Sequence, residues 1–85
     1  MVVTVYSLDN CVQCRNTCLF LDKYGVEYTL LDIKKDPNAA AILDKYNFQT
    51  APVVTVLDDY GNEDIWCGFR IDKIKELADT RVVSS

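Results

Sequence analysis

A Cys-x-x-Cys motif, Cys11-Val12-Gln13-Cys14, lies between an apolar run and a helical pattern near the start of the chain. The preceding residues, 1–7, are rich in β-branched side chains and predict a buried strand. Two cysteines at this spacing in a strand–loop–helix context indicate thiol–disulfide chemistry or metal binding. The motif therefore favours folds that place the start of a helix beside the end of a strand.

The composition removes several other classes of protein. The chain has 85 residues, a net charge of −4 and 49% apolar residues, which suits one domain with a single small core. Because there is no basic run, we expect no nucleic acid and no membrane surface as a partner. No apolar run could span a bilayer, and no signal peptide is evident. We therefore expect a cytoplasmic monomer.

Four cysteines and no histidine define the possible cysteine chemistry. Cytosolic thiols are kept reduced, which argues against a disulfide framework. The cysteine spacing lacks the paired ligands of structural zinc sites, so we expect no metal. We expect Cys18 and Cys67 to be free, partly buried thiols rather than a second redox pair. A non-catalytic module that binds a metal or an iron–sulfur cluster remains the alternative from another class.

The order of elements predicts an α/β fold. Periodicity and turn residues place them in the order β-α-β-α-β-β-α, with strands at 1–7, 26–33, 53–57 and 63–67 and helices at 12–24, 37–46 and 72–80. This order implies a four-stranded mixed sheet with three helices on its two faces. We expect the domain to cover residues 1–80 and a frayed tail to cover residues 81–85.

Three segments together resemble the NrdH-redoxins, which are glutaredoxin-like proteins of the thioredoxin superfamily. They are Cys11-Val12-Gln13-Cys14, Ala51-Pro52-Val53-Val54 and Trp66-Cys67-Gly68-Phe69-Arg70. The resemblance implies the thioredoxin-like fold and a dithiol–disulfide oxidoreductase that acts in electron transport and cell redox homeostasis. It implies ribonucleotide reductase or other disulfide-containing proteins as targets, and NADPH-dependent thioredoxin reductase as the source of electrons. No bound cofactor is implied beyond the redox-active cysteine pair.

The two cysteines of the motif should differ in reactivity. Unpaired N–H groups and partial positive charge at a helix N-terminus stabilise a thiolate, so the pKa of Cys11 should fall below the ~8.5 of a free cysteine. Cys14 should be more shielded, which makes Cys11 the nucleophile and Cys14 the resolving thiol. The carboxylate of Asp9 disfavours the thiolate and should limit the fall. Family members usually carry Lys-Pro where this chain has Leu8-Asp9.

The resemblance also implies a set of substrate-binding residues. In this fold the proline facing the Cys-x-x-Cys motif is usually cis, so we expect a cis Pro52, with Ala51 free to pair with an extended substrate segment. For Trp66, a place in the core and a place at the site both stay open, and for Phe69 we favour the core. The full expected set is Val12, Gln13, Thr50, Ala51, Pro52, Trp66, Gly68, Phe69, Arg70 and Asp72.

A glutathione-dependent glutaredoxin is the alternative within the enzymes. Glutathione is anionic, and glutaredoxins that resemble this chain bind it with basic residues beside the first cysteine. Asp9 stands at that edge here. We therefore rank this alternative below a donor that depends on thioredoxin reductase.

Overall fold

The structure, a computed structural model, describes residues 1–48 and 50–84. Within these residues the chain forms four strands and three helices in the predicted order. The elements are β1 (Val2–Ser7), α1 (Val12–Lys23), β2 (Thr29–Asp32), α2 (Pro37–Tyr46), β3 (Val53–Leu57), β4 (Glu63–Cys67) and α3 (Ile71–Ser84). The predicted α/β class, with a four-stranded mixed sheet, is confirmed.

The first strand lies in the middle of the sheet, whose order is β2-β1-β3-β4. β1 runs parallel to β2, with Val5 opposite Leu30, and antiparallel to β3, with Val5 opposite Val54. β4 closes the sheet as an antiparallel neighbour of β3. The end of β1 thus delivers the cysteine motif next to the start of β3, where Pro52 lies.

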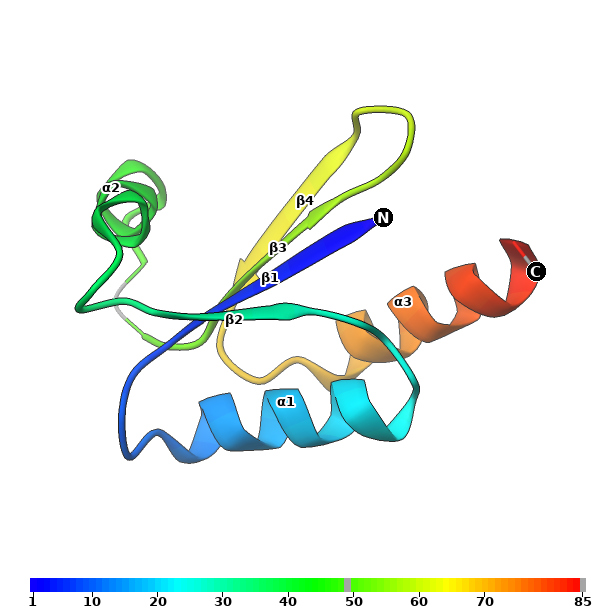
Figure 1. The fold of residues 1–85 in the computed structure, drawn as a ribbon, viewed down its shortest axis with the longest axis horizontal. Helices are drawn as coiled ribbons and strands as arrows, with labels where there is room; N and C mark the ends of the chain where they lie inside the picture. Colours follow the sequence, from blue (N-terminus) through cyan, green and yellow to red (C-terminus); the bar gives the residue numbers. More distant parts are fainter. Residues whose placement is uncertain (49, 85) are drawn as a thin grey trace.

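The helices cover the two faces of the sheet unequally. Figure 1 shows α1 and α3 side by side on one face and α2 on the other. Alternating strand residues point to each face, because successive side chains in a strand point in opposite directions. The main core lies between the sheet and the α1–α3 pair and comprises Val3, Val5, Leu21, Val26, Val54, Val56, Trp66, Ile74 and Leu77.

The C-terminus of α1 explains why the second strand is shorter than predicted. Gly25 adopts a φ of 71°, and its N–H donates to the Asp22 carbonyl while the N–H of Val26 donates to the Leu21 carbonyl. These two bonds form a Schellman motif, which favours glycine at the left-handed position. Val26 is buried at 2% exposure. Because Val26 completes the helix cap, the strand that we predicted to begin there begins at Thr29 instead.

The last helix is longer than the sequence pattern indicated. α3 begins at Ile71 and continues to Ser84, beyond the end that we expected at residue 80. The division into a domain at 1–80 and a tail at 81–85 stays a prediction. Among the described residues, no helix combines the length and the apolar character that crossing a membrane requires.

Candidate active site

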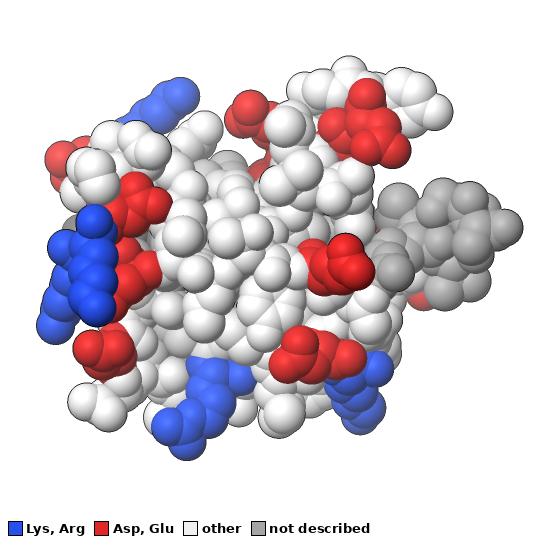
Figure 2. Space-filling view, viewed as in Figure 1, with Lys and Arg blue, Asp and Glu red and all other residues white. Residues whose placement is uncertain are grey.

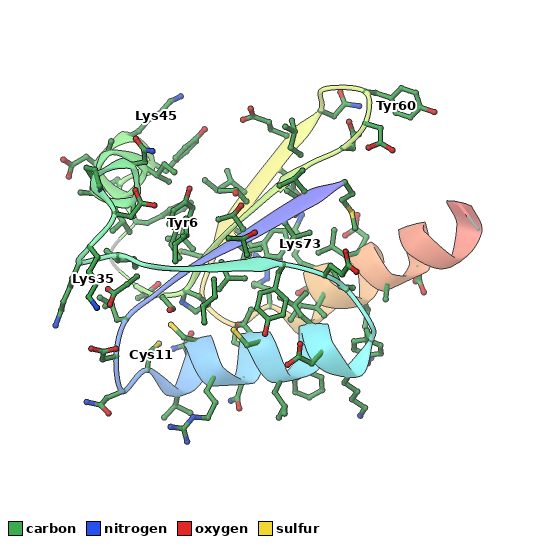
Figure 3. The ribbon with its side chains drawn as sticks, in the orientation of Figure 1. Tyr6, Cys11, Lys35, Lys45, Tyr60 and Lys73 are labelled. Carbon is green, nitrogen blue, oxygen red and sulfur yellow. The ribbon has the colours of Figure 1, made fainter. Side chains whose placement is uncertain are left out.

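Cys11 is the N-cap residue of α1, and its sulfur takes the place of the usual capping oxygen. The N–H of Cys14 donates a hydrogen bond to the Cys11 Sγ over 3.2 Å. The backbone of Cys11 is extended, as an N-cap requires, and its carbonyl already accepts the N–H of Arg15 over 3.1 Å. Figure 3 shows Cys11 at the start of α1, at the end of the molecule where Lys35 also lies. A sulfur in this place meets the positive end of the helix dipole.

The two thiols of the motif differ in exposure and acidity. Cys11 is half-buried, whereas Cys14 is 4% exposed. Burial, together with a hydrogen bond to Cys11, raises the pKa of Cys14 to about 12. All four cysteines lie within the described residues and are free thiols. The arrangement therefore presents one accessible sulfur at a helix N-terminus and one shielded sulfur behind it.

The loop before β3 lies against Cys11. The Cys11 thiol donates to the Ala51 carbonyl over a sulfur–oxygen distance of 3.8 Å. The Ala51–Pro52 peptide bond is cis, and the Pro52 side chain is fully buried. The Pro52 carbonyl accepts the N–H of Gly68 over 2.8 Å. This loop thus contacts Cys11 on one side and the β4–α3 connection on the other.

The β4–α3 connection also contacts the motif directly. The Gln13 Oε1 accepts the N–H of Phe69 over 3.1 Å, and the Phe69 ring lies 5.4 Å from that of Phe20 on α1, centroid to centroid. Gly68 adopts a φ of 80°, which side chains other than glycine rarely adopt. Six of the expected site residues, together with the backbone of Phe69, are therefore brought together here, namely Cys11, Gln13, Cys14, Ala51, Pro52 and Gly68.

Other expected site residues have different surroundings. Trp66 is 4% exposed and belongs to the core, and its Nε1 has no partner among the described residues. Phe69 is half-buried and packs against that core. Arg70 and Asp72 are exposed and form a bidentate ion pair, and this hydrogen bonding lowers the pKa of Asp72. Val12 and Thr50 are exposed, and substrate binding by all of these residues stays a prediction.

A cavity of about 430 Å³ opens on the opposite side of α1 from the Gln13 contact. It is lined by Ser7, Leu8, Asp9, Asn10, Cys11, Cys14, Arg15, Cys18, Leu19, Asp22 and Leu30. Our sequence interpretation did not find this cavity. The positions 11, 14, 15, 18, 19 and 22 do carry a helical period, but the contribution of β2 to its far wall depends on the parallel pairing of β1 with β2.

Cys18 is one helical turn beyond Cys14 and lines the same cavity. Burial raises the pKa of the Cys18 thiol, and a hydrogen bond with Tyr28 acts in the opposite direction. Side chains four residues apart on a helix have Cβ atoms about 5–6 Å apart, whereas a disulfide needs about 3.5–4.5 Å. The helix therefore holds Cys14 and Cys18 too far apart to pair without local unwinding. This geometry favours the interpretation of Cys18 as a free thiol.

Charged side chains of both signs share the surface of the molecule (Figure 2). Figure 2 shows lysine and arginine side chains interspersed with acidic ones on the face that it draws, without a continuous basic surface among the described residues there. Within residues 1–48 and 50–84, no group of three or more cysteine, aspartate or glutamate side chains is arranged to hold a metal ion.

Comparison with known proteins identifies the family. A family model described as Glutaredoxin matches residues 3–60, which is more than half of the chain. The glutaredoxin-like protein NrdH of Salmonella typhimurium is 35% identical over 94% of this chain and 93% of its own length. This chain is a member of the glutaredoxin family, of the NrdH-redoxin type.

Further similarities place this redoxin among thiol–disulfide oxidoreductases. The NrdH protein of Escherichia coli strain K12 is 32% identical over 91% of this chain and 89% of its own length. The solved structure of NrdH-redoxin from Escherichia coli, described as having a thioredoxin-like activity profile, matches with a TM-score of 0.77 at 32% identity, covering 91% of this chain and 95% of the other. This redoxin is therefore a thiol–disulfide oxidoreductase, and its fold is thioredoxin-like.

Proposed function

We propose that this redoxin is a dithiol electron donor that reduces protein disulfides, with ribonucleotide reductase as a target, and that thioredoxin reductase regenerates it with electrons from NADPH. The observation that carries the proposal is the pairing of a half-buried, N-capping Cys11 with a buried Cys14 beside the Ala51–Pro52 loop. Its relatives carry the name NrdH, and the solved structure of one of them is described as having a thioredoxin-like activity profile. Both descriptions support the proposal.

The reaction needs two successive exchanges. The Cys11 thiolate attacks one sulfur of the target disulfide, the target S–S bond breaks, and the second target sulfur leaves as a thiolate that takes up a proton. Cys14 then loses its proton and attacks the Cys11 sulfur of the mixed disulfide formed with the target. The bond between Cys11 and the target breaks, the Cys11–Cys14 disulfide forms, and the target sulfur leaves as a thiolate that takes up a proton to complete the target dithiol. Two electrons pass to the target, and the redoxin is left oxidised. The N–H of Cys14 stabilises the Cys11 anion in the first step.

The proposed docking of the target uses the loop before β3. An extended target segment would pair with the backbone of Ala51 as an added strand, which main-chain hydrogen bonds stabilise. Ala51 is half-buried and its carbonyl lies against the Cys11 sulfur, so a disulfide carried by such a segment would lie within reach of Cys11. This docking needs no cofactor. We also propose that the redoxin acts in the cytoplasm and as a monomer.

Dependence on glutathione is the second candidate, because the matching family model is that of glutaredoxins as a whole. The acidic residue that we expected to disfavour it, Asp9, is exposed and lines the cavity that also contains Cys11. A negative charge at this edge opposes the binding of an anionic tripeptide. We therefore rank thioredoxin reductase above glutathione as the source of electrons.

The test couples NADPH oxidation to the reduction of insulin disulfides. The redoxin is supplied in one assay with thioredoxin reductase and in the other with glutathione and glutathione reductase, and Cys11→Ser is the control in both. We expect turnover with thioredoxin reductase and little with glutathione. The reverse result would make glutathione the physiological reductant. Stoichiometric metal or a cluster absorbance in the purified protein would instead favour the binding module.

A further inference from the structure

Gln13, between the two cysteines, is held from two directions. Its backbone carbonyl accepts the hydroxyl of Thr17 over 2.8 Å, and Thr17 is fully buried. Its side-chain Oε1 accepts the N–H of Phe69 over 3.1 Å. One bond therefore anchors Gln13 to the interior of α1, and the other joins it to a segment 56 residues away in the sequence. The Gln13–Cys14 peptide unit lies between these two anchors.

The turn that Gln13 holds, Gly68–Phe69, is attached at further points. The N–H of Gly68 donates to the Pro52 carbonyl over 2.8 Å, and the Phe69 ring packs on Phe20. Gln13, Thr17 and Phe20 follow at i, i+4 and i+7 and so share one face of α1. This face of α1 thus contacts the turn through the Gln13 amide at one end and the Phe20 ring at the other.

The local packing leaves little freedom for this contact. A Cβ added to Gly68 would lie 3.3 Å from the Gln13 Oε1, which is tighter than ordinary van der Waals contact. The N–H of Phe69 has Gln13 as its acceptor, and the N–H of Gly68 has Pro52. Without the Gln13 side chain, the Phe69 N–H would have to donate to water instead. The turn would then contact α1 only through the Phe69 and Phe20 rings.

We propose that Gln13 is a positioning residue that holds the Gly68–Phe69 turn against the Cys11–Cys14 motif and the Pro52 loop, and so shapes the surface on which a protein disulfide docks. A protein substrate must contact this surface, whereas a small disulfide needs only the Cys11 sulfur. Loss of the contact therefore weakens protein docking more than it slows the exchange at sulfur. The inference rests on the proposed reduction of protein disulfides.

The test is a single-turnover reaction of the chemically reduced protein, so that no reductase takes part. Insulin serves as the protein disulfide and hydroxyethyl disulfide as the small one. Gln13→Leu removes the acceptor at similar volume, Gln13→Glu keeps an acceptor oxygen but removes the N–H donors, and Asn38→Leu is a matched exposed amide on α2. Hydrogen exchange of the Phe69 amide reports the contact itself.

We expect Gln13→Leu to raise the half-saturating insulin concentration about fivefold, which is the effect of one hydrogen bond, and to leave the maximal rate and the rate with hydroxyethyl disulfide within about twofold. The Phe69 amide should exchange faster in Gln13→Leu only. Gln13→Glu should restore slow amide exchange and, in 1 M salt that screens its added negative charge, insulin docking. Asn38→Leu should match the wild type.

Three results would overturn the proposal. Equal losses with both disulfides would place Gln13 in the exchange itself, and an unchanged Phe69 amide would remove the contact on which the inference depends. If Gln13→Glu kept the amide protected yet bound insulin in 1 M salt as poorly as Gln13→Leu, the Gln13 N–H groups would be contacting the substrate directly. Failure of the wild type to reduce insulin would contradict the proposed function instead, so the two failures can be told apart.

Discussion

The N–H of Cys14 donates to the sulfur of Cys11 over 3.2 Å, so the backbone of the buried thiol stabilises the anion of the accessible one. The same helical turn that shields Cys14 thus presents a donor to Cys11. In the exchange that we propose, Cys14 attacks Cys11 from within this same helical turn. The roles that we propose for the two cysteines follow from which of them occupies the N-cap.

Replacing each cysteine of the motif should give different products. Cys11→Ser should abolish reduction of insulin, because no accessible sulfur remains to attack. Cys14→Ser should still attack and should then accumulate as a mixed disulfide with its target, because the resolving thiol is absent. Mass spectrometry under non-reducing conditions measures the adduct. Cys67→Ser is the control, and turnover retained by Cys11→Ser would contradict the assigned roles.

The stability of the reduced protein should fall at alkaline pH. Burial raises the pKa of Cys14 to about 12 in the folded state, and burial also raises the pKa of Cys18. A group with a raised pKa stabilises the fold below its unfolded pKa and loses this contribution as the pH rises towards its folded pKa. Because of Cys14, the free energy of unfolding should therefore fall as the pH rises from the ~8.5 of a free cysteine towards 12, by at most about 1.4 kcal/mol per pH unit, and Cys18 should add to this fall.

Denaturant unfolding at pH 8, 9 and 10 measures this dependence. The oxidised protein is a matched control, because Cys14 in a disulfide has no proton to lose. Its stability should fall less steeply with pH than that of the reduced form, while Cys18 still titrates in both. Equal slopes for the two redox forms would show that Cys14 does not contribute.

Removing the charge of Asp9 should make Cys11 more reactive. Asp9 is exposed, and its carboxylate opposes a nearby thiolate through the long-range charge interaction. Asp9→Asn should speed alkylation of Cys11 by iodoacetamide at pH 7 by up to about fivefold, because two charges a few Å apart in water interact by about 1 kcal/mol. The gain should shrink in 1 M salt, which screens exposed charges. Asp44→Asn on α2 should leave the rate unchanged, and an equal gain there would point to net charge alone.

Gly68 should not tolerate a side chain. Its φ of 80° disfavours other residues, and an added Cβ would crowd the Gln13 Oε1 at 3.3 Å. Gly68→Ala should destabilise the fold by about 1–2 kcal/mol and should expose the Phe69 amide to exchange. Gly61 has a φ of 86° but nothing within 4 Å of an added Cβ, so Gly61→Ala isolates the cost of backbone strain. Equal effects at both glycines would mean that the Gln13 contact adds nothing.

Short-range patterns predicted much of the fold. The bounds of β3 and β4 match their apolar runs and the turn between them, and α2 spans the predicted residues, Pro37–Tyr46. What the patterns missed depends on contacts between distant segments. Val26 looks like a strand residue, yet tertiary packing uses it to complete a helix cap. The Gln13–Phe69 bond could not be predicted, because it requires the register of β4 to be known.

The complete site depends on the pairing of β1 with both β2 and β3. β1, after which the cysteine motif begins, pairs with β2 nearby in the sequence and with β3 far along it, and the second pairing closes the larger loop, which costs more entropy. A partly folded chain that has only β1, α1 and β2 carries both cysteines but lacks the Ala51 carbonyl and the Gly68–Phe69 turn. The cysteines of a nascent or unfolding molecule would therefore be exposed thiols without a docking surface, able to form adducts indiscriminately. In this proposal, selective docking of a target needs the complete sheet, whereas the reactivity of the thiols needs only the start of α1.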